Sequence, residues 1–514
     1  MEYKLDQSKA PLFEAYKAYA TSGVTPFHVP GHKMGRGADP EMLDILGRTM
    51  FMFDNTSLPQ TDNLQHPCGP VRQAQELAAE LYGAQATFFS VNGTSGAVMA
   101  MILSALKRGE KIIIPRNVHK SVTAGIILAG ATPVYVQPVI DEKLGIAHCV
   151  TPESVMESLR MHPDAKAVLI TSPTYYGVAS DTREISKIAH SFHVPLLVDE
   201  AHGAHLRFCP DDLPEDAIAQ GADLVSQSSH KTIGSLTQSS MLHVNSSLIP
   251  VERVASVLNL LHTTSPSFLL LGSLDCARRN MALNGKRLWA DTLELYREAR
   301  TEINKIDGLH SFGEEDLPGK RKRCFDPTKL TICCRGLGMT GHELEATLYE
   351  EYGIQVEFSN CNHVLLVGSH GDSAEGIQRL IHALRGIASE RGVRHYEAKK
   401  VEVPDIPRSA VTLGSAFFSG KRTIPFQQSE GAVSAEFVIS YPPGIPILCP
   451  GEVITRQIID YCSRLLEAGV TLTGMESCNL ETIRVVSADA EPSFERNPRT
   501  NDTTATPYYD YAYQ

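Results

Sequence analysis

Short apolar runs alternate with helical stretches from about residue 75 to residue 230. The runs are residues 86–91, 111–115, 132–139, 166–173, 194–201 and 222–228. Each run is continuously apolar rather than apolar at every second position, which is typical of strands buried on both faces. Helical stretches separate several of them, for example residues 95–109, where Gly109 can end the helix. This alternation predicts an α/β fold with a mostly parallel sheet covered by helices.

Breaks in the pattern divide the chain further. Gly, Pro and His are frequent near the N-terminus, a polar break begins at residue 313, and a Pro-rich turn begins at residue 401. The predicted units are an N-terminal arm (1–65), a large domain (66–312), a small α/β domain (313–400), a C-terminal domain (401–487) and a disordered tail (488–514).

Composition narrows the class of protein. The 47 basic and 59 acidic residues give a net charge of −12, and no basic block is present, so we expect no nucleic-acid partner. The 11 cysteines are scattered and form no CxxC pair, which favours reduced thiols. The chain starts without a signal-peptide pattern and has no apolar run of about 18 residues, so we expect no membrane span. The cytoplasm is the expected location.

Three motifs follow directly after predicted strands. NGTSG occupies residues 92–96, DEAHGAH occupies residues 199–205, and SSHKT occupies residues 228–232. In a parallel sheet the carboxyl ends of the strands share one edge, where ligands bind. The motifs are therefore expected to meet at one site.

Each motif has a plain structural interpretation and a chemical one. Thr94 and Ser95 open a helix and form either an ordinary helix cap or a phosphate site. Asp199 ends an apolar strand, where a carboxylate needs a cation, a metal or a protonated ring nitrogen. Lys231, beside His230, is either a solvated surface residue or a partly desolvated amine that reacts with aldehydes. Together the motifs supply the contacts that pyridoxal 5'-phosphate requires.

The wider sequence resembles the ornithine/lysine/arginine decarboxylases, which have the aspartate-aminotransferase fold (fold type I). It is most similar to the compact bacterial arginine decarboxylases that lack an N-terminal wing domain. The resemblance runs from about residue 10 to residue 487. It depends on the segments FHVPGHK, AQELAAELYGA, FFSVNGTSGA, IIIPRNVHKS, PTYYGVASD, VPLLVDEAHGAH, SSHKTIGSLTQSS and YPPGIPILCPGE.

The resemblance implies roles in binding the cofactor. Lys231 binds the aldehyde of pyridoxal 5'-phosphate, and Asp199 pairs with its ring nitrogen. His119 stacks on the ring, although without the family a capping or core histidine would be favoured. The other implied contacts are the phosphate group (Gly93, Thr94, Ser95 and Ser228) and the ring face (Ala201 and His202).

The resemblance also implies groups that act on the substrate or cross to a second subunit. His230 handles protons or the substrate carboxylate. Thr264 or Ser265 reaches the phosphate from the partner in a homodimer whose active site lies at the interface. Glu452 meets the distal cation of the substrate, or is instead a helix N-terminal glutamate stabilised by the helix dipole.

The implied reaction is the decarboxylation of L-arginine to agmatine, which feeds polyamine synthesis. Lysine and ornithine stay open as substrates because the sequence departs from the family at three positions. Asn360 stands in VEFSN where the family has E-x-S-D. Asn63 and Gln65 stand where the family has Asp and His.

Single motifs in the chain are also compatible with other functions. DEAH also marks P-loop helicases, but the phosphate-binding pattern GxxxxGK[ST] is missing. A zinc hydrolase could use Asp199, His202 and His205, with His28 and His32, but this leaves Lys231 unexplained. Aminotransfer on the same fold and a non-catalytic regulatory homologue are the remaining alternatives. We therefore expect no metal.

Overall fold

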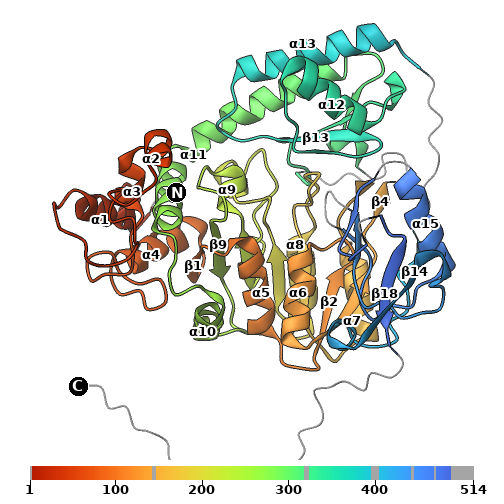
Figure 1. Cartoon of the computed structure of the whole chain (residues 1–514), viewed down its shortest axis with the longest axis horizontal. Helices are drawn as coiled ribbons and strands as arrows, with labels where there is room; N and C mark the ends of the chain where they lie inside the picture. The colour runs from red at the N-terminus through yellow and green to blue at the C-terminus, as the bar shows by residue number, and fades with distance from the viewer. Residues whose placement is uncertain are drawn as a thin grey trace, which may run out of the picture.

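The computed structural model describes residues 3–141, 146–317, 323–394, 404–440, 445–467, 470–477 and 479–487, with Ile445 described by its backbone alone. The tail predicted at residues 488–514 lies outside this part. A central unit holds the main sheet, a smaller unit lies above it, the C-terminal unit lies at one side, and the N-terminal helices lie at the other (Figure 1).

The central sheet of the described chain has seven strands. In spatial order they are β1 (Ala86–Ser90), β9 (Ser240–Val244), β8 (Leu224–Gln227), β7 (Leu196–Asp199), β6 (Ala165–Thr171), β2 (Lys111–Pro115) and β3 (Thr132–Val136). β9 is antiparallel to both of its neighbours, and every other pair is parallel. The prediction of a mostly parallel α/β sheet is confirmed.

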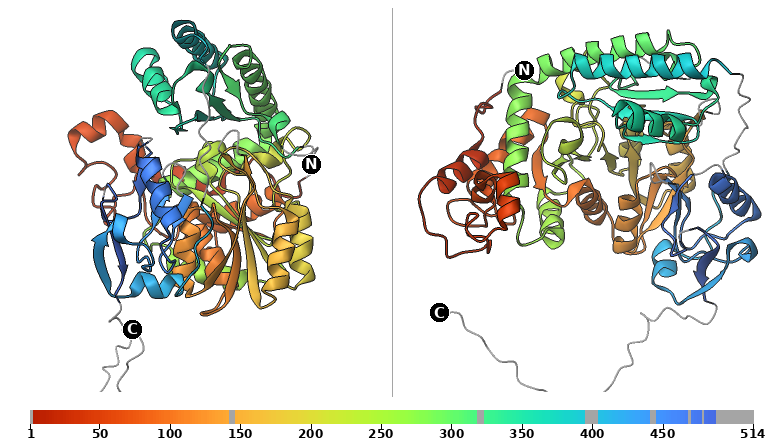
Figure 2. Two further views of the ribbon diagram at one scale, coloured as in Figure 1. Left: turned by 90° about the vertical axis from the view of Figure 1, so that its right-hand side faces the viewer. Right: turned by 45° about the horizontal axis from the view of Figure 1, so that its top comes forward.

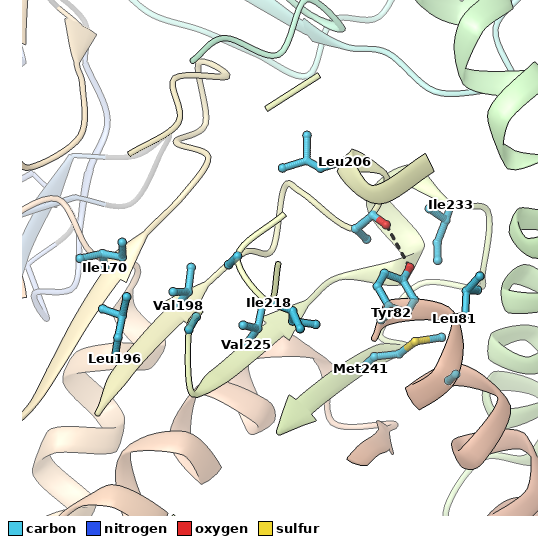
Figure 3. Close-up of a cluster of buried hydrophobic side chains, with 14 of the residues drawn as sticks. Leu81, Tyr82, Ile170, Leu196, Val198, Leu206, Ile218, Val225, Ile233 and Met241 are labelled. Carbon is cyan, nitrogen blue, oxygen red and sulfur yellow. Dashed lines mark hydrogen bonds between the residues drawn. The ribbon is translucent and has the colours of Figure 1, made fainter. Parts of the chain in front are cut away.

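Both faces of this sheet are apolar, as the continuous runs predicted. Ile113 points to one face, whereas Ile112 and Ile114 point to the other. The buried side chains on the first face come from neighbouring strands (Figure 3), and the labelled strand residues are Ile170, Leu196, Val198, Val225 and Met241. The helices on this first side are α4 (Pro70–Tyr82), α7 (Pro152–Met161), α8 (Thr182–Ser191) and the first part of α11 (Phe268–Ile303). The helices on the second side are α5 (Gly93–Ala105), α6 (Lys120–Ala129) and α10 (Val251–Leu261).

Helices also occur near the N-terminus, where the pattern showed only an arm. They are α1 (Pro11–Ala20), α2 (Pro40–Leu46) and α3 (Arg48–Phe53). Leu12 and Tyr16 of α1 belong to the core that includes α4 and α11. The backbone N–H of Leu12 donates to Asp275, whose carboxylate also binds Arg278 at 2.8 Å in the buried interior. The segment is thus fixed to the large unit by burial and by buried polar contacts.

The smaller unit is built on an antiparallel sheet. Its four described strands are, in order, β10 (His310–Ser311), β11 (Lys329–Cys333), β13 (His363–Val367) and β12 (Phe358–Ser359). Its core is shared with α12 (Gly341–Tyr352), α13 (Ala374–Arg391) and the end of α11. The long α11 therefore runs from the N-terminal helices to the small unit (Figure 1).

The C-terminal unit packs beside the large one (Figure 2). Its helices and strands are α14 (Leu413–Phe418), β14 (Lys421–Pro425), β15 (Val438–Ser440), β16 (Ile445–Leu448), α15 (Arg456–Glu467), β17 (Leu472–Thr473) and β18 (Thr482–Val486). Other short elements include the β4–β5 pair (Ile140–Asp141 and Ile146–Ala147) and α9 (Ser229–Thr232). Within the described ranges, no helix is long and apolar enough to cross a membrane.

Candidate active site

The three motifs gather at one edge of the central sheet. β1, β7 and β8 run in the same direction, because β9 lies antiparallel between β1 and β8. Their carboxyl ends carry the N-terminus of α5, Asp199 and the short helix with Lys231. The juxtaposition that the sequence predicted is therefore present.

Hydroxyl groups converge at the start of α5. The Thr94 hydroxyl lies 2.5 Å from Ser228 Oγ and 2.9 Å from Ser240 Oγ. Ser240 in turn donates to the Gln227 carbonyl at 2.7 Å. The Ser229 hydroxyl is buried without a partner in the described structure. Thr94, Ser228 and Ser240 thus form a cluster of hydroxyl groups, and the Ser229 hydroxyl has spare hydrogen-bonding capacity.

The first turn of α5 has free backbone donors in the same place. The N-cap residue Asn92 makes no side-chain capping bond. The Gly93 N–H donates to the Gln238 carbonyl at 2.9 Å, which leaves the Thr94 and Ser95 N–H groups of the first turn available. Gly93 has a φ of 67°, a left-handed conformation that an L side chain would strain. Ser95 is exposed in this turn. Free N–H groups, hydroxyls and the helix dipole together suit a phosphate.

Lys231 is a partly buried amine rather than a solvated surface residue. Its Nζ lies 2.8 Å from His202 Nε2 and 5.8 Å from the centre of the Tyr175 ring. Burial lowers the pKa of Lys231, and the positive charge of Lys329 lowers it further, while two carboxylates oppose the shift. Burial and the charge of Lys231 also hold the pKa of His202 well below its usual value, so this imidazole is neutral. A larger fraction of the amine is consequently in the uncharged, nucleophilic form.

Asp199 is a buried carboxylate with little compensation. It is 3% exposed, and its Oδ1 accepts one hydrogen bond, from the Ala201 N–H at 3.2 Å. Burial raises the pKa of Asp199, and the nearby His119 and Lys231 oppose that rise. A protonated ring nitrogen would supply the missing cation. The residues at this edge therefore fit pyridoxal 5'-phosphate at its aldehyde, its ring nitrogen and its phosphate.

Two histidines lie beside these groups. His119 caps α6, because its Nδ1 accepts the Ser121 N–H at 3.2 Å, so the capping interpretation holds. The same ring interacts electrostatically with Asp199, and burial lowers its pKa. His230 uses Nδ1 to donate to the Ser239 carbonyl at 2.9 Å, and burial lowers the pKa of His230 as well. Both rings favour the neutral form.

Glu452 has a different environment from the predicted one. Its carboxylate forms a buried two-point ion pair with Arg116, with distances of 2.5 Å and 2.8 Å, and it also accepts the Cys449 N–H at 2.8 Å. Both oxygens are thus occupied, so this carboxylate is not available for a substrate cation in this chain. The substrate role of Glu452 stays a prediction, and the structure gives it no support.

In the described structure, Thr264 and Ser265 make none of these contacts. Both are exposed in the segment between α10 and α11. A contact with the cofactor phosphate of a second subunit stays a prediction.

Some site residues were missed by the sequence reasoning. Ser240 could have been found, because an antiparallel β9 returns its first residue to the same edge as Ser228. Tyr175 and Glu357 carried no local signal. Tyr175 follows β6, Glu357 precedes β12 of the small unit, and the Tyr175 hydroxyl donates to the Glu357 carboxylate.

A buried charge cluster lies behind the site. Asp326 is paired with Lys329 and with His205 of the DEAHGAH motif, each at 3.1 Å, and all three are fully buried. The His205 ring also packs 4.2 Å from the Trp289 ring. His205 is thus bound to a carboxylate, and His202 lies against Lys231. In the part of the chain that is described, no group of three or more His, Cys, Asp or Glu residues is arranged to hold a metal.

Comparison with known proteins agrees with this geometry. Residues 10–376 match the family model for the major domain of Orn/Lys/Arg decarboxylases, and residues 412–483 match the model for their C-terminal domain. An arginine decarboxylase of Bacillus subtilis is 45% identical over 485 residues, which is 94% of this chain and 99% of that protein. An arginine decarboxylase of Bacillus anthracis is 43% identical over 94% of this chain and 98% of that protein.

A solved structure supports the fold. The lysine decarboxylase LdcF of Francisella novicida superposes with a TM-score of 0.81 at 21% identity, covering 93% of this chain and 81% of that one. The predicted fold type I architecture is confirmed. The chain belongs to the Orn/Lys/Arg decarboxylase family.

Proposed function

We propose that this protein is a decarboxylase that converts L-arginine to agmatine and carbon dioxide with pyridoxal 5'-phosphate. The observation that carries the proposal is the placement of the Lys231 amine and the buried Asp199 carboxylate at one edge of the sheet. When bound, the cofactor supplies an electron sink for the breaking bond between Cα and the carboxylate. The protein supplies binding, orientation and electrostatics.

We assign each part of the cofactor to residues that would bind it. Lys231 holds the aldehyde and Asp199 the ring nitrogen. The proposed phosphate group consists of the α5 N-terminus with Gly93, Thr94, Ser95 and Ser228. The groups that pack against the ring are His119, Ala201 and His202.

The protein's own residues also determine which groups of the site carry protons during the reaction. The buried Asp199 carboxylate favours a proton on the cofactor ring nitrogen, because two opposite charges in a low dielectric stabilise each other. His202 is held neutral 2.8 Å from Lys231, so its Nε2 can accept a hydrogen bond from that amine. We propose that Lys231 or His230 delivers the proton that replaces carbon dioxide at Cα.

The choice of arginine is supported by relatives named arginine decarboxylases at 43–45% identity over nearly the whole chain. Lysine and ornithine are the alternative substrates, since a constitutive lysine decarboxylase of Escherichia coli is 24% identical over 92% of this chain. If the product is agmatine, the enzyme contributes to polyamine synthesis, which agmatine feeds.

The test is a product assay with arginine, lysine and ornithine offered in parallel to the enzyme loaded with cofactor. Agmatine as the main product, with one carbon dioxide released for each, is the expected result. Cadaverine or putrescine would overturn the choice of substrate. Amino transfer that depends on a ketoacid, without release of carbon dioxide, would overturn the reaction itself.

We also propose that the enzyme works as a homodimer or a higher homo-oligomer. Large apolar side chains are exposed near the N-terminus, among them Phe27 at 92%, Val29 at 64% and Ile45 at 74%. Exposed apolar side chains that form a contiguous patch are typical of an interface between subunits. Thr264 of one copy would then meet the phosphate of the other, as the family resemblance implies.

The cytoplasm is the proposed location. No disulfide joins the cysteines that the structure describes, and unlinked cysteines are typical of reducing compartments.

A further inference from the structure

Two loops of the large unit contact Lys231 and determine how its amine is held. The loop after β7 carries His202, whose Nε2 lies 2.8 Å from Lys231 Nζ. The loop after β6 carries Tyr175, whose ring centre lies 4.4 Å from that of His202 and 5.8 Å from Lys231 Nζ. His202 Nδ1 is buried without a hydrogen-bond partner in the described structure. The position of this imidazole therefore depends on what holds its loop.

The loop with Tyr175 is attached to a segment that leads into the small unit. Val178 pairs with Phe325 in an isolated antiparallel bridge, and the Asp326 N–H donates to the Gly177 carbonyl at 2.8 Å. Gly177 has a φ of 88°, and a Cβ on it would lie 2.8 Å from the Asp326 carbonyl oxygen. No side chain fits between the two backbones here, so this segment fixes the position of the loop.

The loop with His202 is attached to the same segment by charge. Lys329 Nζ and His205 Nε2 each lie 3.1 Å from the same oxygen of Asp326, and all three side chains are fully buried. His205 belongs to the same loop as His202 and lies three residues after it. Through Asp326, one segment of the small unit therefore holds both loops that contact Lys231.

This segment is itself firmly fixed. It leads into β11, an inner strand of the small sheet between β10 and β13. Arg300 of α11 donates to the Pro327 and Lys329 carbonyls at 3.1 Å and 3.0 Å. Asp326 Oδ1 accepts the Thr328 N–H at 3.0 Å and the Thr328 hydroxyl at 2.7 Å. A side chain with so many fixed neighbours can hold a loop in one place.

Stability alone does not account for a buried charge in this position. Moving a lysine and an aspartate out of water is unfavourable, and apolar residues of similar size are often as stabilising as a buried ion pair, or more so. Lys329 is nevertheless fully buried at the start of β11. Its charge also acts on the site, because it lowers the pKa of Lys231 and the pKa of His202. An apolar pair in the same place would have no such effect.

We propose that Asp326 and Lys329 are positioning residues of the active site. They hold the loops of His202 and Tyr175 in the places from which these side chains orient the Lys231 amine toward the cofactor aldehyde. Their effect passes through the two loops rather than through contact with the substrate or the cofactor. The inference rests on the proposed function, because it takes Lys231 as the residue that binds the cofactor.

The test replaces the charged pair with uncharged side chains of similar size, Asp326→Asn together with Lys329→Met. This pair variant buries no unpaired charge, so its melting temperature should stay close to that of wild type, unlike that of Asp326→Asn alone. The full-length proteins are freed of cofactor and mixed with pyridoxal 5'-phosphate. The capture rate is the rate at which the visible absorbance of lysine-bound cofactor then appears. We expect it to fall roughly 10- to 100-fold, because a displacement of about 1 Å at a reacting group has an effect of this size.

The matched control neutralises a surface ion pair in the same way. Asp212→Asn with Arg297→Met removes a pair whose atoms lie 2.8 Å apart and whose side chains are more than 40% exposed. The capture rate of this control should equal that of wild type. Lys329→Met alone is a second variant for the case in which the pair variant does not fold, because His205 can then take up a proton and balance Asp326. Its capture rate should also fall.

A double-mutant cycle separates positioning from a general loss of structure. His202→Gln removes an imidazole through which the pair is proposed to act. Adding the pair substitutions to His202→Gln should therefore slow capture by less than about half the factor by which they slow it in wild type. A larger factor would mean that the pair and His202 act independently, and it would overturn the inference.

The outcomes keep this inference apart from the proposed function. Equal capture rates in wild type and the pair variant, with carbon dioxide released from arginine by wild type, would overturn the positioning role alone. If wild type captured the cofactor but released no carbon dioxide from any basic amino acid, the proposed decarboxylation would fall. The capture rates would then still decide the positioning role. A wild type without the visible band would overturn both.

Discussion

Lys231 shows how burial changes the chemistry of a single residue. A lysine on a protein surface is a charged, hydrated group, but here burial and the neighbouring Lys329 lower the pKa of its amine. Asp199 is the complementary case, because burial raises the pKa of its carboxyl and so favours pairing with a cation. Each group alone is unfavourable in the apolar interior, which is typical of a site prepared for a ligand.

Replacement of Lys231 tests this role most directly. Lys231→Ala should abolish the visible absorbance of lysine-bound cofactor and reduce kcat by roughly 10⁴-fold or more, since the amine that binds the aldehyde is lost. Absorbance spectra of the purified, cofactor-loaded proteins give the first value and carbon dioxide release gives the second. Lys187→Ala, on the exposed surface of α8, is the control and should match wild type. An intact visible band in Lys231→Ala would show that another residue binds the cofactor.

At this scale the sequence predicted residues whose role follows from their place at a strand end. The sequence placed Asp199, Lys231 and Thr94 at one edge of the sheet, because each motif directly follows an apolar run. Glu357 could not be placed near Lys231 this way, because it contacts Tyr175 only after two units pack together. The ion pair of Glu452 could not be predicted either, since its partner Arg116 lies 336 residues away in the sequence. The local sequence pattern predicts where a residue lies along the backbone. It does not predict which charged residue, distant in the sequence, will be buried next to it.

Among the elements of the sheet, β9 contains a buried titratable residue. His243 lies between β1 and β8, with Nδ1 2.8 Å from the Thr87 hydroxyl and Nε2 3.1 Å from the Gln227 side-chain oxygen. Burial, aided by the charge of Arg207, lowers the pKa of His243 to about 3. The ring is therefore neutral in the folded protein at neutral pH.

This histidine makes the fold sensitive to acid. An unfolded histidine has a pKa of about 6.5, so between that value and about 3 the unfolded chain binds a proton that the folded chain does not. The free energy of unfolding should therefore fall as the pH falls, by roughly 2 kcal/mol per such residue between pH 6.5 and pH 5. Urea unfolding across this pH range measures the slope.

The comparison for this prediction is between two histidine variants. His243→Gln removes the titrating ring, so its loss of stability between neutral pH and pH 5 should be smaller than in wild type, even if the variant is less stable throughout. His193→Gln changes an exposed histidine and should keep the wild-type slope. Equal slopes in wild type and His243→Gln would contradict the argument.

A second element-level feature is the buried cluster that joins β11 to the loop after β7. Asp326 pairs with Lys329 and His205 with no exposure to solvent, and these partners hold the pKa of Asp326 well below its usual value. Asp326→Asn leaves the Lys329 charge without its counter-ion in the interior. The free energy of unfolding at pH 7 should fall by about 3–5 kcal/mol, which urea unfolding can measure.

The control for Asp326 is a solvent-exposed pair. Asp212 binds Arg297 at 2.8 Å, with both side chains more than 40% exposed. Asp212→Asn should lower stability by about 1 kcal/mol or less, because water screens this pair. Similar losses in the two variants would mean that the buried cluster contributes no more than a surface ion pair.

For the whole molecule, the sequence predicted the layers of the large unit better than the relations between units. Continuous apolar runs such as residues 166–173 indicate strands with both faces covered, and the structure has helices on both faces. The N-terminal helices were not predicted, because α2 and α3 have only 7 and 6 residues and too few turns to show a helical period. The domain boundaries stay predictions.

The exposed N-terminal residues give the last prediction, which concerns assembly. Phe27 and Ile45 expose 92% and 74% of their surfaces, an arrangement that a second copy of the chain would cover in the proposed dimer. Ile45→Glu would place a charge in that interface, where desolvation without a partner is unfavourable. Sedimentation should show wild type as a dimer or larger and the variant shifted toward monomer, with decarboxylation falling in parallel because Thr264 would no longer reach a partner's phosphate. Met161→Glu changes a residue that is 64% exposed on α7 and should leave both assembly and activity unchanged. A fully active monomer of Ile45→Glu would show that each chain holds a complete active site, and it would remove the reason to place Thr264 at a shared one.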